Sequence, residues 1–277
     1  MNAFKEQCLE LRRKDYTLPE IVKATGRSKT SVYFHIQNLP LSERKQKSIH
    51  KLYGKRIRKF SLAKKGKSSR DFRKFSKWNK EKVFLISHLL FDGEIYYGGC
   101  AYNNRSSTLI EQVAKTMKNI YLFEPKRYEN PLTGVSRIAY YNVALGAYVK
   151  AKAADLLQQI CYLSPNLKRE FLKSFFDDEG CMDFRPKNNR RRVRGYQKNT
   201  GVLIIVQKLL SDFGINSRIE LPNEVVIAGK ENIQNFKKEI NFSAGIYING
   251  ERSNSIWKKS LEKREILKMA LASYETK

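Results

Sequence analysis

The sequence predicts an α+β protein made of two pseudo-symmetric αββαββα repeats, with a small helical domain before them. Two matching stretches are the first observation: FLISHLLFDG begins at residue 84 and FLKSFFDDEG begins 87 positions later, at residue 171. The same order of predicted elements follows each stretch, which is the second observation. A helix, a glycine-containing turn and another helix near the N-terminus are the third. We therefore expect five segments: a helix-turn-helix domain (1–40), a basic linker (41–80), a first repeat (81–163), a second repeat (164–250) and a helical C-terminal tail (251–277).

The composition points to a polyanionic partner. The chain has 277 residues and a formal net charge of +27, and neutralising phosphates with Lys and Arg releases counterions. No apolar run is long enough to span a membrane, and the N-terminus has no apolar signal core. The four cysteines lack zinc-ligand spacing, so we expect reduced core thiols. These features predict an intracellular protein, cytoplasmic or nucleoid-associated, that binds nucleic acid and no membrane.

The first 40 residues predict three short helices, at 4–13, 18–25 and 29–36. Thr17 is a suitable N-cap for the second helix, and Gly26 lies just after its end. In the third helix Val32 and Ile36 share the inner face. The outer face, together with the cap, presents the candidate DNA-binding residues Ser28, Lys29, Thr30 and Tyr33. A plain three-helix bundle is the alternative, but the net charge favours a DNA-binding helix-turn-helix.

Residues 41–80 form a basic stretch with few acids and with interspersed aromatic residues. A solvated linker is one interpretation. We favour a partly helical tether that lies along phosphates and becomes ordered on binding.

Each repeat is predicted element by element from its periodicity and turn residues. In the first, a helix from residue 82 ends at Gly93, which is able to take a left-handed cap. The remaining elements of this repeat are strands 94–97 and 100–103, helix 106–119, strands 121–124 and 135–141, and helix 143–160. The second repeat is predicted to contain helix 167–179, strands 181–185 and 191–197, helix 201–213, strands 217–221 and 224–228, and helix 231–240.

The two motif helices resemble those of the LAGLIDADG homing endonucleases. Residues 171–180 look like the family's common form FLRGFFDAEG, and residues 85–93 keep the apolar frame and the final Asp-Gly. The resemblance covers roughly residues 80–250. It implies that the motif helices pack together at the interface between the repeats, that the two four-stranded sheets form a DNA-binding saddle, and that the protein hydrolyses phosphodiesters on both strands.

The acids at the ends of the motif helices are the candidate metal ligands. Asp92 and Glu179 coincide under the 87-residue repeat, and each precedes a glycine. The resemblance implies that these acids hold divalent metal over the minor groove. Mg²⁺ (or Mn²⁺) prefers hard oxygen ligands and activates water for hydrolysis, so a pair of carboxylates suits it. We predict that both acids are catalytic and metal-binding.

Other candidate site residues come from the second repeat. The family commonly has a basic residue where the fourth strand meets the next helix, which implies Lys230, and it uses the end of the second strand, which implies Gln197 and Lys198. A lysine in so basic a protein is also commonly a phosphate contact. Arg190, Arg192 and Arg194 belong to a run of arginines on or beside the first hairpin of this repeat, where alternate residues are able to reach phosphates or guanine edges.

Two departures from the family pattern bear on activity. The usually small seventh motif position holds Phe91 in one helix and Asp178 in the other. A phenylalanine there is large enough to displace Asp92. We predict a monomeric, Mg²⁺-dependent, site-specific double-stranded DNA endonuclease. The alternative is a transcription regulator that uses a non-cleaving LAGLIDADG scaffold to bind DNA.

Overall fold

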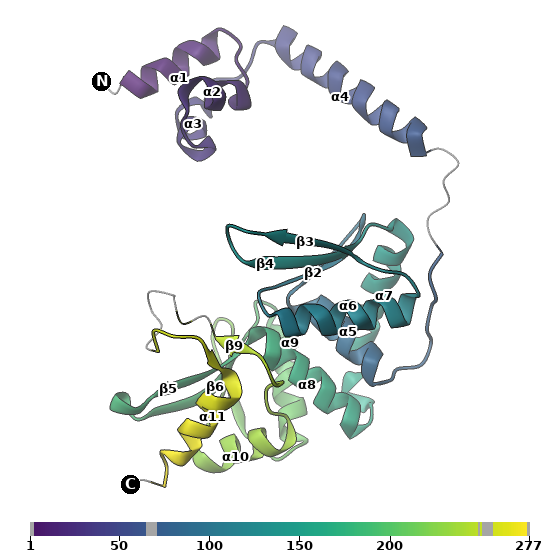
Figure 1. Cartoon of the computed structure of the whole chain (residues 1–277), viewed down its shortest axis with the longest axis vertical. Coiled ribbons are helices and arrows are strands. Elements are labelled where there is room, and N and C mark those ends of the chain that lie inside the picture. The colour runs from purple at the N-terminus through teal and green to yellow at the C-terminus, as the bar shows by residue number, and fades with distance from the viewer. Residues whose placement is uncertain (1–2, 65–70, 249, 251–256, 276–277) are drawn as a thin grey trace. The chain divides into compact units, whose positions relative to one another are not determined.

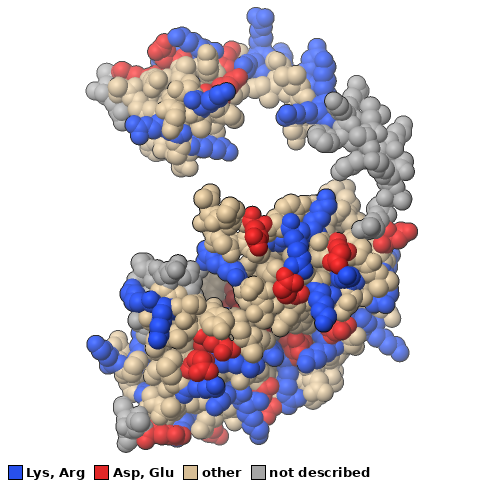
Figure 2. Space-filling view, in the orientation of Figure 1, with Lys and Arg blue, Asp and Glu red and all other residues tan. Residues whose placement is uncertain are grey.

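The computed structural model describes residues 3–64, 71–248, 250 and 257–275. It divides into two compact units, Met1–Ser68 and Ser69–Lys277. Lys and Arg side chains are spread over both units on the face shown in Figure 2, interspersed with fewer Asp and Glu side chains.

The N-terminal unit is helical. It contains α1 (Ala3–Arg13), α2 (Leu18–Thr25), α3 (Lys29–Ile36) and α4 (Glu43–Lys64). Its small core consists of the buried side chains Cys8, Ile21, Val32 and Ile36. The first three helices confirm the bounds expected from the sequence to within one residue.

Local capping explains where α2 begins and ends. The Thr17 backbone N–H donates to Glu20 Oε2 at 2.6 Å, which satisfies one of the free donors at the helix N-terminus. Gly26 has φ +64°, a left-handed conformation that glycine adopts without strain. This cap sets the turn between α2 and α3.

The second unit contains the two predicted repeats, and the α+β fold class is confirmed (Figure 1). The first repeat consists of α5 (Lys80–Phe91), β1 (Gly93–Tyr96), β2 (Gly99–Asn104), α6 (Ser107–Tyr121), β3 (Lys126–Asn130), β4 (Val135–Tyr140) and α7 (Val143–Gln159). The second consists of α8 (Pro165–Glu179), β5 (Gly180–Arg185), β6 (Arg190–Tyr196), α9 (Thr200–Ser211), β7 (Ser217–Glu220), β8 (Glu224–Ala228) and α10 (Lys230–Glu239).

The two sheets have the same antiparallel topology. The strand order is β1-β2-β4-β3 in the first sheet and β5-β6-β8-β7 in the second. Helices α6 and α7 pack on the first sheet, and α9 and α10 pack on the second. One apolar core runs through both repeats and includes side chains from both motif helices. The duplicated topology therefore brings the ends of the motif helices to equivalent places.

The predicted strand at 121–124 is wrong. Tyr121 is buried and ends α6, and Leu122 adopts a left-handed φ of +65° that closes the helix. The strand β3 begins at Lys126, and all five of its residues are exposed. Tyr121 packs in the core at the end of α6 while Leu122 is exposed, and the edge strand carries no apolar alternation that periodicity could detect.

The C-terminal segment covers part of the second repeat. It contains β9 (Tyr247–Ile248), β10 (Leu261–Glu262) and α11 (Lys263–Ala272). Helix α11 packs against β5 and α10. The predicted tail at 251–277 thus contributes one helix, while residues 251–256 and 276–277 lie outside the described residues.

The predicted linker is divided between the two units. Its first part forms α4, residues 65–70 lie outside the described residues, and the part after them packs on the second unit. There the backbone N–H of Phe75 donates to the Tyr148 hydroxyl at 2.7 Å, and that hydroxyl donates to the Phe75 carbonyl at 2.7 Å. The aromatic residues near position 75 therefore belong to the core rather than to a free tether.

Two further predictions concern chemistry and membranes. Cys8 and Cys100 are buried free thiols and Cys161 is half-buried against the core, but Cys181 is exposed, so the prediction of four core thiols is wrong for Cys181. Among the described residues, no helix has the length and apolar character needed to cross a bilayer.

Candidate active site at the ends of the two motif helices

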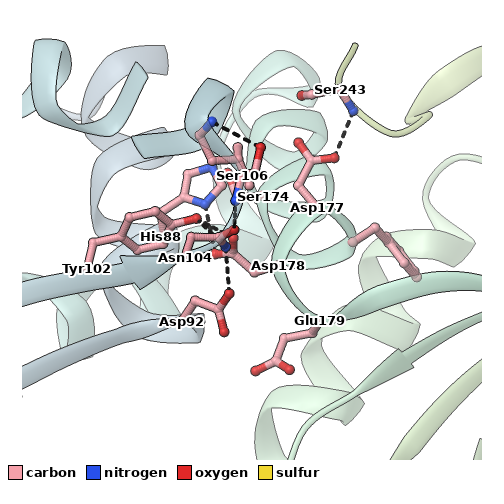
Figure 3. Close-up of polar contacts among 12 residues, drawn as sticks. His88, Asp92, Tyr102, Asn104, Ser106, Ser174, Asp177, Asp178, Glu179 and Ser243 are labelled. Atoms are coloured by element: carbon pink, nitrogen blue, oxygen red, sulfur yellow. Dashed lines mark hydrogen bonds and ion pairs between the residues drawn. The ribbon is translucent and has the colours of Figure 1, made fainter. Parts of the chain in front are cut away.

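Helices α5 and α8 pack against each other and carry Asp92 and Glu179 to the same end of the pair (Figure 3). Asp92 is the C-cap of α5, and Glu179 is the last residue of α8. A helix C-terminus disfavours a carboxylate electrostatically, and here two carboxylates face one another in that environment. This arrangement favours a cation between them.

The glycine after each acid is required by close packing. A Cβ on Gly93 would lie 2.2 Å from the Leu89 carbonyl oxygen, and one on Gly180 would lie 2.5 Å from the Phe176 carbonyl oxygen. Gly180 is extended, with φ −97°, and Gly93 is not among the positive-φ residues. The expected left-handed cap at Gly93 is therefore wrong, and the glycine instead lets each strand start directly against the last helical turn.

Each acid has a carboxamide partner supplied by the neighbouring strand. Asn104 Nδ2 donates to Asp92 Oδ2 at 2.8 Å, and Gln197 Nε2 lies 3.5 Å from Glu179 Oε1. The two amides occupy equivalent places, because each lies two residues beyond the strand residue that pairs with the motif glycine. The sequence identified Gln197 and missed Asn104, which the strand register would have revealed.

The environment keeps both acids from ionising easily. Burial raises the pKa of Asp92 to about 7, and the nearby Asp178 carboxylate adds to the shift. Burial also raises the pKa of Glu179 to about 8, with further contributions from Asp92 and Asp178. Like charges in a partly desolvated site have this effect, and a bound cation would reverse it.

The donor set at the helix ends fits a hard divalent cation. It offers carboxylate oxygens from two sides and amides that orient them, as Mg²⁺ requires. Among the described residues no cluster of three or more His, Cys, Asp and Glu side chains could hold a metal alone. Two carboxylates would leave coordination positions for phosphate oxygens and water, which is how Mg²⁺ is commonly bound.

The large residue at the seventh position of the first motif is accommodated by aromatic packing. The Phe91 ring meets Phe171 and Phe175 of α8 edge to face, with centroids 5.4 and 5.2 Å apart. Asp92 still reaches the end of the helix, where Asn104 bonds it. The expected displacement of Asp92 is therefore not observed.

The seventh position of the second motif, Asp178, is a buried acceptor for the first repeat. Its side chain is fully buried, and its oxygens lie 2.7 Å from His88 Nδ1 and 2.6 Å from the Tyr102 hydroxyl (Figure 3). Burial of the ring lowers the pKa of His88, but the Asp178 carboxylate outweighs this and raises the pKa above its ordinary value. The pair is therefore an ion pair across the interface between the repeats.

A buried lysine that the sequence did not single out lies beside the acids. Lys263, the first residue of α11, donates to the Asp177 carbonyl at 2.7 Å, in the last turn of α8. Burial lowers its pKa, and the surrounding carboxylates oppose that effect. The Lys230 ammonium group instead lies 4.0 Å from Glu275.

The predicted arginines lie on one face of β6. Arg190, Arg192 and Arg194 are half-buried and alternate with buried residues. Their nearest carboxylates belong to Asp183 (3.6 Å from Arg190), Glu220 (3.4 Å from Arg192) and Glu224 (2.9 Å from Arg194). Lys198, just beyond the strand, is exposed. The ion pairs hold the guanidinium groups in place on the open face of the second sheet.

The predicted DNA-contacting residues of the N-terminal unit lie on its surface. Ser28 caps α3 by accepting a hydrogen bond from the Ser31 backbone N–H at 3.2 Å. Lys29 and Thr30 are exposed, and Tyr33 is 53% exposed. The structure thus leaves this helix face open for contact.

Comparison with known proteins identifies the second repeat. Residues 166–241 match the family model described as a LAGLIDADG-like domain. No curated protein matches the chain. Similar solved structures include mesophilic variants of the homing endonuclease I-DmoI (18% identity, covering 58% of this chain and 95% of that one, TM-score 0.45). I-DmoI in complex with DNA and Mn is also similar (20%, 58% and 96%, 0.45), as is full-length DUF199/WhiA from Thermatoga maritima (15%, 73% and 69%, 0.45).

The match spans α8 through α10 and includes Glu179. The first repeat, although it lies outside the matched residues, has the same element order and the same sheet topology. The second repeat therefore matches the LAGLIDADG-like domain family, in agreement with the resemblance of its motif helix.

Proposed function

We propose that the protein is a site-specific endonuclease that hydrolyses double-stranded DNA with divalent metal held by Asp92 and Glu179. The observation that carries the proposal is the pairing of these carboxylates at the ends of packed motif helices, each with its own carboxamide partner. Burial and nearby carboxylates raise the pKa values of the two acids to about 7 and 8, and a bound cation would favour their ionised forms.

The chemistry would be divided between the metal and the protein. The metal ion, when bound, lowers the pKa of a water molecule and offsets charge on the phosphate oxygens. Asp92 and Glu179 would fix its position, and Asn104 and Gln197 would orient these acids. Lys263 holds the last turn of α8 and adds positive charge beside them. Lys230 and Lys198 remain candidate phosphate contacts in this proposal.

The sheets and the basic surface would supply DNA affinity. The net charge of +27 supports a double-stranded DNA partner. On β6, the side chains of Arg190, Arg192 and Arg194 share one face, as contact with consecutive phosphates or base edges requires. Because the chain contains both repeats, we propose that it acts as a monomer with internal pseudo-twofold symmetry.

One experiment tests the central proposal. The protein is incubated with a randomised duplex library, with and without Mg²⁺, and the new DNA ends are sequenced. We expect ends at a recurring sequence only when Mg²⁺ or Mn²⁺ is present. Binding without any cleavage, on a target selected by affinity, would contradict the endonuclease proposal.

A non-cleaving transcription regulator is the second candidate function, favoured by the N-terminal unit. Its third helix exposes Lys29, Thr30 and Tyr33 near the helix N-terminus, where a recognition helix contacts bases. The triple variant Lys29→Ala, Thr30→Ala and Tyr33→Ala should shorten the DNA footprint at one end. An unchanged footprint would show that the unit does not bind DNA in this way.

A further inference from the structure

A continuous chain of hydrogen bonds joins Asp178 of the second repeat to Asp92 of the first. The Tyr102 hydroxyl donates to Asp178 Oδ1 at 2.6 Å and accepts from Asn104 Nδ2 at 3.0 Å. The same amide nitrogen donates to Asp92 Oδ2 at 2.8 Å. Figure 3 shows these side chains converging from β2, α5 and α8. The first motif acid is thus connected to a carboxylate on the opposite motif helix.

These hydrogen bonds restrict the Asn104 amide to one orientation. Both of its N–H groups are used, one toward Asp92 and one toward Tyr102, and its oxygen accepts from the Ser106 backbone N–H at 2.8 Å. Tyr102 and the side chain of Asp178 are fully buried. Buried, fully satisfied polar networks restrict their members to one arrangement.

Among the residues that the structure describes, the second repeat has no equivalent of this support. The strand residue that pairs with the motif glycine is Tyr102 in the first repeat and Gly195 in the second. A Cβ on Gly195 would lie 2.4 Å from the Phe175 ring, so no larger residue fits there. The Gln197 amide oxygen accepts from the Asn199 N–H at 3.3 Å, but its nitrogen lies 3.5 Å from Glu179. The second acid is therefore held more loosely.

We propose that Tyr102 and Asp178 are positioning residues that fix Asp92 through Asn104, and that the two halves of the site are unequal as a result. The proposal rests on the metal-dependent function proposed above. Because Asp178 belongs to the second repeat, Asp92 takes its working position only when the repeats are correctly paired. Unequal support should make the two DNA strands respond differently when the hydrogen-bond chain is broken.

The test compares Tyr102→Phe with Tyr121→Phe. Both remove a hydroxyl from a buried tyrosine of the first repeat. The Tyr121 hydroxyl has no hydrogen-bond partner among the described residues, which makes it a matched control. Mn²⁺ binding is measured at one fixed pH by electron paramagnetic resonance of the free ion. Cleavage of each strand is followed on an end-labelled target duplex.

We expect Tyr102→Phe to weaken Mn²⁺ binding about fivefold, the effect of one lost net hydrogen bond. The rate constants for the two strands should fall unequally, so that nicked DNA accumulates. Tyr121→Phe should match the wild type in both measurements. A purely structural role for Tyr102 would lower thermal stability without changing the ratio of the two strand rates.

Other outcomes separate this proposal from the proposed function. If the wild type neither binds Mn²⁺ nor cuts, the endonuclease function and this inference both fail. If the wild type does both and Tyr102→Phe behaves like Tyr121→Phe, only the positioning role is overturned. Should Tyr102→Phe not fold, the double variant His88→Asn, Asp178→Asn weakens the acceptor of the Tyr102 hydroxyl without leaving a buried imidazolium unpaired. It should shift the strand ratio in the same direction, and an unchanged ratio would overturn the role.

Discussion

The interface between the motif helices α5 and α8 has two equivalent contacts, of which one is polar and the other is aromatic. His88 corresponds to Phe175, and Asp178 corresponds to Phe91, because each lies 87 positions from its counterpart. On one side His88 and Asp178 form a buried ion pair at 2.7 Å. On the other, Phe91 and Phe175 meet edge to face at 5.2 Å. Sequence duplication therefore fixes where contacts occur, while the chemistry of each contact has diverged.

This difference specifies which repeats pair. Two copies of the second repeat would bury Asp178 against Phe175, and two copies of the first would bury His88 against Phe91. A buried charge without a partner is costly, and here Asp178 pairs with His88 Nδ1 of the other repeat, while His88 Nε2 has no hydrogen-bond partner among the described residues. The interface thus favours pairing of unlike repeats, in agreement with two repeats in one chain.

The two repeats are most alike at their motif acids, and we expect the largest effect from substituting these acids. Asp92→Asn and Glu179→Gln should each reduce metal-dependent cleavage by roughly 10³-fold or more, because each removes a carboxylate that would hold the ion. DNA affinity measured with Ca²⁺ should change little. Strand-specific cleavage assays check this, and a variant that cuts as well as the wild type would show that the metal site has been misplaced.

The next prediction breaks the polar side of the interface and compares it with the aromatic side. His88→Phe leaves Asp178 buried without its cationic partner and should lower the free energy of unfolding by about 3 kcal/mol. Phe91→Leu, the matched change on the aromatic side, should cost about 1–1.5 kcal/mol. Urea denaturation of both variants measures the difference. Equal losses would mean that the ion pair has no special role.

A third prediction concerns pH and has a definite sign. Both acids have folded-state pKa values above their ordinary ones, about 7 for Asp92 and about 8 for Glu179. Between about pH 4 and pH 8 the folded state therefore retains protons that the unfolded state has lost, so metal-free stability falls as pH rises. The double variant Asp92→Asn, Glu179→Gln should be more stable than the wild type at pH 8, by a difference on the order of 1 kcal/mol after solvent screening.

Thermal unfolding at pH 5 and pH 8 provides the measurement. The difference in melting temperature between the double variant and the wild type should increase as pH rises. Mn²⁺ should raise the melting temperature of the wild type alone. A gap that stays constant from pH 5 to pH 8 would contradict the raised pKa values.

The last prediction distinguishes the two faces of β6. Arg192 is on the open face, whereas Arg191 is buried, with its Nε donating to Ser273 Oγ at 2.7 Å. Arg192→Ala should weaken DNA binding by about tenfold at low salt and reduce the salt slope by about 1. Arg191→Ala should mainly lower stability. Fluorescence anisotropy across a salt series tests both variants. If neither variant changes the salt slope of the wild type, neither arginine contacts DNA.

The sequence alone determined most elements of the first three helices and of the two repeats, and their order. Capping residues such as Thr17 and Gly26 are local signals, and the bounds of α1–α3 followed from them. The 87-residue repeat aligned Asp92 with Glu179, since register along a duplicated helix is a property of the sequence itself. Where periodicity was absent, as in the exposed strand β3, the prediction was wrong.

Only the tertiary structure decided which side chains meet at the site. Asn104 and Gln197 lie at different sequence distances from Asp92 and Glu179, but strand register puts the two amides at equivalent places. Lys263 begins a helix 84 positions after Glu179, and the fold alone brings its ammonium group against the last turn of α8. Asp178 stands at the usually small seventh motif position, and only the fold shows that it accepts hydrogen bonds from His88 and Tyr102 of the first repeat. Local pattern cannot encode such contacts, because they depend on which surfaces the packed repeats bring together.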